Sequence, residues 1–171
     1  YLKLILGSSY LAQDKFGQAL GNFKEALNVL RDKKVDHKIF ENSLNYYIGV
    51  CYKYLGSYDE AISQYAWFNA NGQNIAGEVN YQKGDIYMLK QEYDSAIAFF
   101  NIAYSFYLEK YGPFNINNTL NSLFKISQCN VKTGNLELAK SQARKTLFYM
   151  AGDTVITPDK LLPDTIPADN A

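Results

Sequence analysis

The 171-residue sequence has few of the residues on which catalytic and metal sites depend. Its one histidine, His37, excludes a site built from several histidines. The chain also has no C-x-x-C, no H-E-x-x-H, no phosphate-binding glycine loop and no dinucleotide-binding fingerprint. Matches to penicillin-binding motifs at 122–125 and 132–134 are discounted, because both fall in one predicted helical hairpin and the S-D-N element is missing. We therefore predict no enzyme activity, no metal and no cofactor.

The sequence also lacks net charge and long apolar runs. Seventeen basic residues balance seventeen acidic ones, so the basic surplus typical of nucleic-acid binding is absent and we expect no direct contact with nucleic acid. No run approaches eighteen apolar residues, so we expect no membrane insertion. An initiator methionine and a signal peptide are missing, and Tyr1 already lies in a periodic segment. We expect a truncated or processed chain with a cytoplasmic location.

Hydrophobic residues, in contrast, make up 47% of the chain and recur in a fixed pattern. In each of four segments, a small residue is followed by a tyrosine or asparagine three positions later and by an alanine twelve positions later. The anchors are Gly7, Tyr10, Ala19; Gly49, Tyr52, Ala61; Gly84, Tyr87, Ala96; and Ser127, Asn130, Ala139. We expect the small residue and the alanine to let two helices pack closely. Aromatic residues further along are expected to fill the wedge between neighbouring pairs.

This spacing resembles the tetratricopeptide repeat family, most clearly in YIGVCYKYLGSYDEAISQY, residues 47–65. The small residues follow one another at 42, 35 and 43 positions, whereas the usual period is about 34. Such lengthened repeats are similar to those of kinesin light chains and of bacterial and ciliary scaffolds. The resemblance implies an all-α fold, a right-handed superhelix of four helix pairs.

We predict that this array covers residues 1–150 and that an extended, proline-containing tail follows over 151–171. The expected repeats are 1–34, 42–75, 77–110 and 120–150. The expected helices are 2–13, 16–33, 37–55, 58–72, 75–90, 93–110, 115–133 and 136–150. Leu161 and Leu162 of the tail are hypothesised to fold back as a cap, because the last helix of a solenoid otherwise exposes an apolar face. Cys51 and Cys129, two repeats apart, are predicted to be reduced and buried.

The resemblance also implies a partner-binding groove on the concave face, lined by the first helix of each pair. Position by position, it predicts as groove residues Tyr46, Lys53, Tyr54, Tyr81, Asp85, Phe124, Gln128 and Lys132, with Glu78 in the same lining. The Lys and Asn pair by which some members hold a C-terminal carboxylate has no match here. We expect instead a helix or extended segment with apolar anchors. Alternatively, the tyrosines only fill the inner curve between neighbouring helices.

The function that the resemblance implies is a protein-protein interaction scaffold or adaptor that binds a protein or peptide rather than a small molecule. One alternative is the peptide-sensing domain of a bacterial quorum-sensing-type regulator, which would need a helix-turn-helix domain upstream. Another is an architectural subunit that packs side-on in a larger assembly. The sequence alone leaves these alternatives open.

Overall fold

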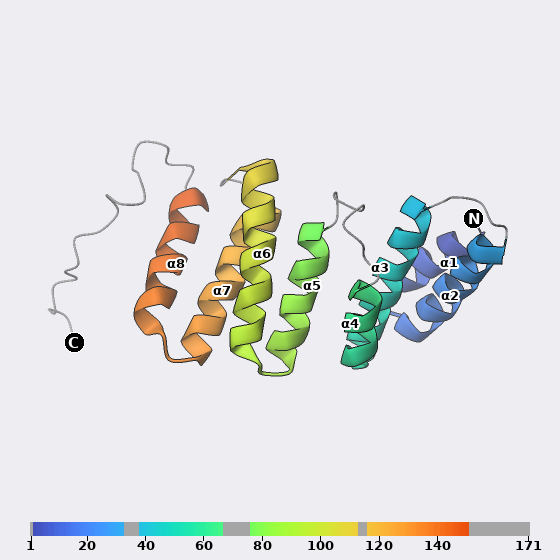
Figure 1. Cartoon of the computed structure of the whole chain (residues 1–171), viewed down its shortest axis with the longest axis horizontal. Coiled ribbons are helices and arrows are strands. Elements are labelled where there is room, and N and C mark those ends of the chain that lie inside the picture. The colour runs from blue at the N-terminus through green and yellow to red at the C-terminus, as the bar shows by residue number, and fades with distance from the viewer. Residues whose placement is uncertain (1, 33–37, 67–75, 113–115, 151–171) are drawn as a thin grey trace, which may run out of the picture.

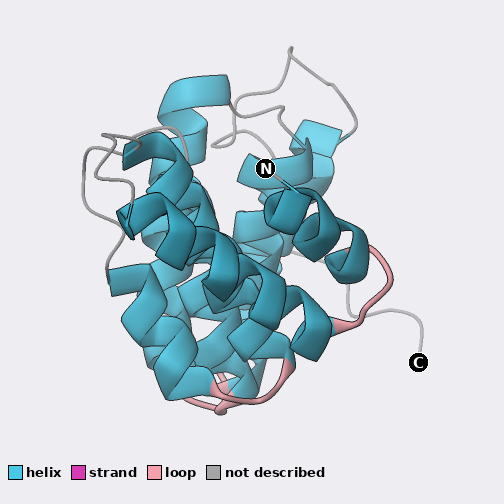
Figure 2. Ribbon diagram, turned by 90° about the vertical axis from the view of Figure 1, so that its right-hand side faces the viewer, coloured by secondary structure: helices cyan, strands magenta, loops and turns pink. Residues whose placement is uncertain are grey.

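A computed structural model of the chain describes residues 2–32, 38–66, 76–112 and 116–150. The helices follow one another in chain order along the long axis of the molecule, from α1 and α2 at one end to α8 at the other (Figure 1), and Figure 2 shows only helices and short loops among the described residues. They are α1 (Leu2–Leu11), α2 (Phe16–Asp32), α3 (Lys38–Tyr54), α4 (Tyr58–Ala66), α5 (Ala76–Leu89), α6 (Tyr93–Tyr111), the π-helix η1 (Ile116–Leu120), α7 (Asn121–Lys132) and α8 (Leu136–Met150). The prediction of an all-α helical-repeat solenoid is confirmed.

The turn inside each helix pair has the same geometry in all four pairs. Its central residue has a positive φ, 56° at Asp14, 79° at Gly56, 63° at Gln91 and 82° at Gly134. The next residue donates its backbone N–H to the carbonyl five positions earlier, for example Ser57 to Tyr52 at 2.9 Å. This bond closes the helix end. Glycine meets the positive φ without steric cost, whereas Asp14 and Gln91 adopt it as non-glycine residues.

The small residue of the first helix receives an aromatic ring from the second helix. A Cβ added to Gly49 would lie 2.5 Å from a ring carbon of Tyr65, and one added to Gly84 would lie 2.7 Å from Phe100. Phe23 covers Gly7 in the same way. The same rings also pack against the next pair: Phe23 stacks on Tyr47 of α3 with centroids 5.3 Å apart, and Phe100 lies in one buried cluster with Ile126 of α7. The expectation that these rings fill the wedge between pairs is therefore confirmed.

The fourth pair solves the same packing problem with the sizes exchanged. Ser127 stands where the other pairs have glycine, and Ala143, sixteen residues later, stands where they have the ring. The Ser127 hydroxyl donates to the carbonyl oxygen of Ala139 at 2.9 Å. The small partner at 143 makes room for the serine side chain, so the two helices still pack closely.

The helix expected over 115–133 is described from residue 116 to residue 132, and the correction concerns only the type of its first turn. Residues Ile116–Leu120 form a π-helical turn before α7 begins at Asn121. Within that turn the buried Thr119 hydroxyl donates to the carbonyl oxygen of Gly112 at 3.0 Å. This bond satisfies a carbonyl at the end of α6 and joins α6 to the start of the fourth pair. The other helix bounds agree with the predictions to within two residues wherever the chain is described.

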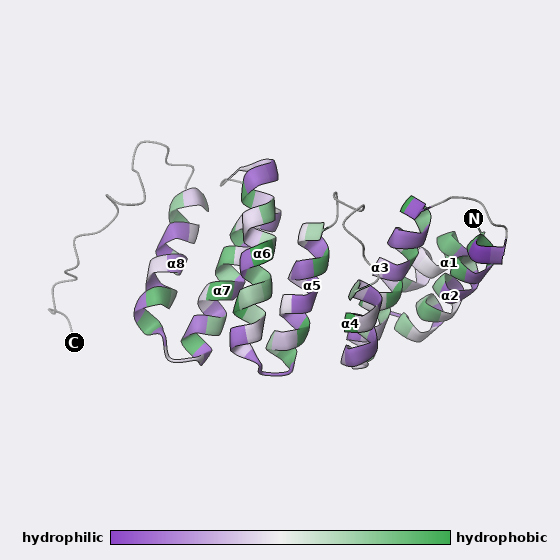
Figure 3. Cartoon of the chain, in the orientation of Figure 1, coloured by the Kyte–Doolittle hydropathy of each residue, from purple (hydrophilic) through white to green (hydrophobic). Residues whose placement is uncertain are grey.

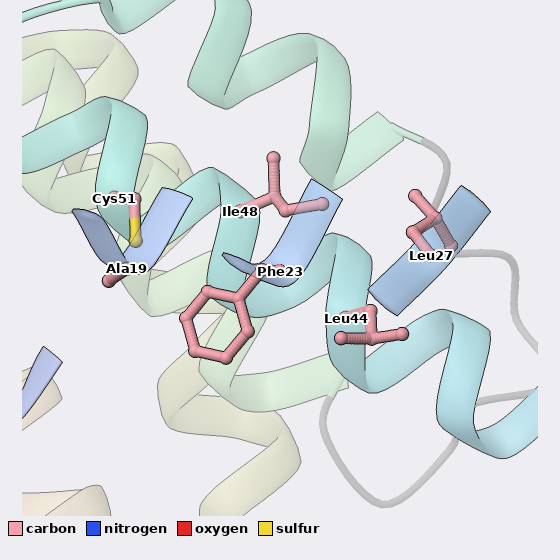
Figure 4. Packing of buried hydrophobic residues seen from close by; sticks show 6 residues of the cluster. All are labelled: Ala19, Phe23, Leu27, Leu44, Ile48 and Cys51. Atoms are coloured by element: carbon pink, nitrogen blue, oxygen red, sulfur yellow. The ribbon is translucent and has the colours of Figure 1, made fainter. Parts of the chain in front are cut away.

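Three clusters of buried side chains lie between the helices, and hydrophobic residues recur along every helix (Figure 3). The first, between α2 and α3, contains Ala19, Phe23, Leu27, Leu44, Ile48 and Cys51 (Figure 4). The prediction that Cys51 and Cys129 are buried and free is confirmed. Burial raises the pKa of the Cys51 thiol to about 11. His37, the part of the predicted helix over 67–72, and the tail with its leucine cap lie outside the described residues.

Candidate partner-binding face

The first helices of the pairs, α1, α3, α5 and α7, form what we call the first-helix face. A row of three charged residues joins the last three of these helices. Lys53 Nζ on α3 lies 3.4 Å from a carboxylate oxygen of Asp85 on α5, and Lys125 Nζ on α7 lies 3.0 Å from the other oxygen. Lys53 is only 7% exposed. Its burial lowers the pKa of its ammonium group, an effect that the charge of Asp85 opposes.

A second polar cluster is centred on Glu78, which lies two turns before Asp85 on α5. Its carboxylate accepts hydrogen bonds from the Tyr46 hydroxyl at 2.9 Å, from Gln82 Nε2 at 2.7 Å and from the Tyr107 hydroxyl at 2.9 Å. Burial, together with the negative charge of Glu78, raises the pKa of Tyr46 and Tyr107 well above the usual value. Gln82 in turn accepts from Lys53 Nζ. The cluster thus binds α3, α5 and α6 together.

The structure divides the predicted groove residues into buried and exposed members. Tyr46 is half-buried through its bond to Glu78, and Tyr81 is half-buried with its edge against the ring of Phe100, 5.4 Å between centroids. Tyr46 thus joins two neighbouring first helices, α3 and α5, as the alternative interpretation expected, whereas Tyr81 packs against the second helix α6 of its own pair. Asp85 is half-buried between its two lysines.

The exposed members are aromatic or polar side chains on the first helices α3 and α7. Tyr54 stacks on Phe16 of α2 with centroids 4.5 Å apart and still exposes 58% of its area. Phe124 on α7 is 48% exposed. Gln128 is half-buried and Lys132 is exposed on the same helix. These residues, unlike Tyr46 and Tyr81, are available to a binding partner.

Sequence reasoning missed Gln82, Tyr107 and Lys125 as members of these two polar clusters. Gln82 carried a usable signal, because it lies one helical turn after Glu78 on the same side of α5. Lys125 was considered only as part of a catalytic motif. Tyr107 is on α6, a second helix, so assigning the groove to first helices could not include it. Its contact with Glu78 depends on how α6 packs across α5.

Neither metal ligands nor a membrane span emerge from the described ranges. No group of three or more His, Cys, Asp or Glu residues there is arranged to hold a metal ion. None of the described helices is long and apolar enough to cross a bilayer.

The family model of the tetratricopeptide repeat matches residues 77–106, which cover most of α5 and α6. The match supports a repeat of this type; the equivalent turns extend the pattern to the other three pairs, and the packing glycines extend it to the first and second pairs. No curated protein matches the chain significantly. Tetratricopeptide repeats define a class of protein-protein interaction modules that typically have no enzyme activity of their own. The chain is thus a helical-repeat protein with at least one pair of the tetratricopeptide type.

Proposed function

We propose that the chain is a scaffold or adaptor module that binds a peptide or a helix of a partner protein along a concave first-helix face. The observation that carries this proposal is the exposure of Tyr54 and Phe124, which leave about half of their area open to solvent. They lie on α3 and α7, the helices on either side of α5. Large aromatic side chains beside charged groups are typical anchors of protein interfaces.

The charged row between these two aromatics gives the proposed groove a polar floor. Lys53 and Asp85 are held by their mutual contact and by the Gln82 bond, so they cost little entropy when a partner binds. Lys125 keeps 29% of its side chain exposed while it pairs with Asp85. A bound segment would place apolar side chains on Tyr54 and Phe124 and an acidic or amide group near Lys125.

Tyr46 and Tyr81 have a different role in this proposal. They hold α3, α5 and α6 in position through Glu78 and Phe100, and do not contact the partner. Substituting either would change the shape of the face as well as its chemistry. Variants that test binding should therefore leave both tyrosines unchanged.

The test is affinity capture followed by mass spectrometry, with variants confined to exposed side chains. We expect Tyr54→Ser combined with Phe124→Ser to lose a partner that the wild type captures. The matched control is Leu138→Ser combined with Leu147→Ser on α8, whose leucines are equally exposed. A photoreactive residue at position 124 should then crosslink to the same partner. Each variant must first show cooperative unfolding.

An architectural role is the second candidate, and one observation favours it. The last helix, α8, exposes four large apolar side chains, Leu136, Leu138, Leu147 and Met150. A subunit that packs side-on through α8 would lose its partner in the α8 variant and keep it in the first-helix-face variant. That reversed result would contradict the groove proposal directly.

A further inference from the structure

The helices α1 and α8 lie at opposite ends of the long axis of the molecule (Figure 1). At the junctions inside the array, a second helix packs against the first helix of the next pair, as α2 does on α3 and α6 does on α7. Among the described helices, none precedes α1 and none follows α8. Each of these two helices therefore has one side that an internal junction would bury and that the described residues leave open.

On α1 this side contains Leu2, Ile5 and Ser9, which we call the α1 stacking face. Leu2 is 68% exposed and Ile5 is 64% exposed. Ile5 stands at the position of Tyr47, which stacks on Phe23 of the preceding second helix. In the other first helices, the residues at the position of Leu2 are all buried: Leu44, Val79 and Ser122. Those at the position of Ser9 are each 0% exposed: Cys51, Ile86 and Cys129. The repeat thus places the α1 stacking face where a preceding second helix would cover it.

On α8 the open side contains Lys140, Leu147 and Met150, which we call the α8 stacking face. Leu147 is 65% exposed and Met150 is 53% exposed. At the same positions of α2, Leu27 is 6% exposed and Leu30 is half-buried, and both pack in the cluster that α2 shares with α3. The α8 stacking face therefore repeats the surface on which α2 receives α3.

Each stacking face has one polar position, and the two polar positions match. At the three junctions between the described pairs, a half-buried apolar residue of the second helix shares a cluster with a fully buried residue of the next first helix: Leu20 with Cys51, Ile62 with Ile86, and Ile97 with Cys129. The equivalent residues at the two ends are Lys140 on α8 and Ser9 on α1. Both members of this contact are polar at the ends, and a lysine ammonium group can donate to a serine hydroxyl. The two open faces therefore complement each other in polarity as well as in position.

We propose that the α8 stacking face binds the α1 stacking face of a second copy of this chain, so that the solenoid continues from one molecule into the next. A second copy brings a first helix to α8 and a second helix to α1, with the residue spacing already used at the internal junctions. In this contact the apolar residues of the two faces meet, and Lys140 lies at Ser9 of the copy.

The position of the two faces determines the kind of assembly. They lie at opposite ends of the molecule, so one chain cannot bring its own two faces together (Figure 1). The contact joins unlike faces and does not close, so copies add one after another. A contact of one helix on another is small, so the association is weak and reversible.

The test is sedimentation velocity of the purified full chain at rising protein concentration. We expect the average sedimentation coefficient of the wild type to increase with concentration, through dimers and then through longer assemblies. The α1 variant is Leu2→Ser combined with Ile5→Ser, and the α8 variant is Leu147→Ser combined with Met150→Ser. Each should associate at least about tenfold more weakly, because two apolar side chains are lost from the contact.

The matched control is Leu138→Ser, which also removes an exposed leucine from α8. Leu138 is 52% exposed, at the position of the exposed Gln18 and Glu60 in other second helices, so it lies outside the α8 stacking face. We expect this variant to associate like the wild type. Cooperative unfolding must first show that every variant is folded.

A mixture of the two variants tests whether unlike faces meet. The α1 variant keeps an intact α8 stacking face, and the α8 variant keeps an intact α1 stacking face. We expect an equimolar mixture to form a one-to-one dimer and nothing larger, with the affinity of the wild-type contact. In the wild-type background, a photoreactive residue at position 147 should crosslink to the peptide of another copy that contains Leu2.

Several results would each overturn the proposal. One is a wild type that stays monomeric at every concentration; if the α8 variant then also loses stability, residues 151–171 become the candidate cover of α8. The others are undiminished association of either variant alone, equal weakening by Leu138→Ser, and a mixture that forms no dimer. All of these measurements use the purified chain without the partner proposed for the first-helix face. The two proposals can therefore fail separately.

Discussion

The second and third helix pairs share one steric framework but differ in their polar chemistry. Both have a packing glycine beneath a ring, Gly49 beneath Tyr65 and Gly84 beneath Phe100. At the equivalent asparagines, however, the third pair satisfies its own donor, whereas the second leaves Asn45 Nδ2 unpaired. The second pair instead directs its tyrosine and lysine donors to acceptors on α5. The comparison shows that the framework sets the fold while the remaining positions are free to form contacts and sites.

The largest effect is expected where the two pairs are alike. Gly49→Ala and Gly84→Ala should each lower the free energy of unfolding by about 3 kcal/mol, because the new methyl group would overlap a ring. Gly21→Ala, on the open side of α2 with no atom within 4 Å of the added carbon, should raise it by about 1 kcal/mol. Urea unfolding followed by circular dichroism measures all three. A tolerated alanine at position 49 or 84 would show that the shared framework does not depend on the glycine.

The contact between the two pairs gives the next largest effect. Glu78→Ala should lower the free energy of unfolding by about 2 kcal/mol, because two tyrosine hydroxyls and an amide lose their acceptor. Glu78→Gln retains one acceptor oxygen and should cost less. Glu60→Ala, an exposed acidic residue on α4, should change stability by less than about 0.5 kcal/mol. Equal losses in the Glu78 and Glu60 variants would refute the role of the cluster.

Alkaline pH tests the same contact through Tyr46, the residue of the second pair that donates to Glu78. The pKa of Tyr46 is raised above the ordinary tyrosine value of 10.0, chiefly by burial and then by Glu78, so the unfolded chain loses this proton first. Its stabilising contribution is complete below pH 10.0 and is lost as the pH rises above it. Between about pH 8 and pH 11 the wild type should lose about 1.4 kcal/mol more than Tyr46→Phe. Parallel pH profiles for the two proteins would contradict this assignment.

The smallest effect is expected where the two pairs differ. Asn45→Leu should raise the free energy of unfolding by about 1 kcal/mol, because an unpaired buried donor is replaced by an apolar group. Asn80→Leu should lower it by about 1 kcal/mol, since it removes an existing hydrogen bond. Thermal and urea unfolding of the two variants measure these changes in the free energy of unfolding. The same sign of change in both variants would show that the two asparagines are equivalent.

Much of the architecture could be predicted because it depends on residue spacings within a single repeat. The twelve-residue spacing from Gly49 to Ala61 gives the length of one turn and two half-helices, and its recurrence gives the number of pairs. The turns at Gly56 and Gly134 follow from the ease with which glycine adopts a positive φ. The π-helical turn over Ile116–Leu120 did not follow, because its stabilising bond from Thr119 reaches the end of the preceding helix.

The candidate sites were predicted less completely. The groove positions that the family resemblance supplied include exposed Tyr54 and Phe124, but they also include Tyr46 and Tyr81, which pack between helices. Periodicity assigns a residue to a side of its helix and does not say how closely the next helix approaches. The unpaired amide of Asn45 was not predicted, because no local pattern distinguishes Asn45 from Asn80.

The sequence by itself therefore determined the helix pairs, their number and the small residues that let them pack, since these depend on spacings within about forty residues of chain that repeat. The tertiary structure alone decided which polar groups meet and which are left without a partner. Tyr46 and Glu78 are 32 residues apart, and their bond forms only because the stacking of pairs brings α3 beside α5. The same stacking encloses Asn45 without giving it an acceptor. Both outcomes depend on the distance and rotation between neighbouring helices, which no single helix specifies.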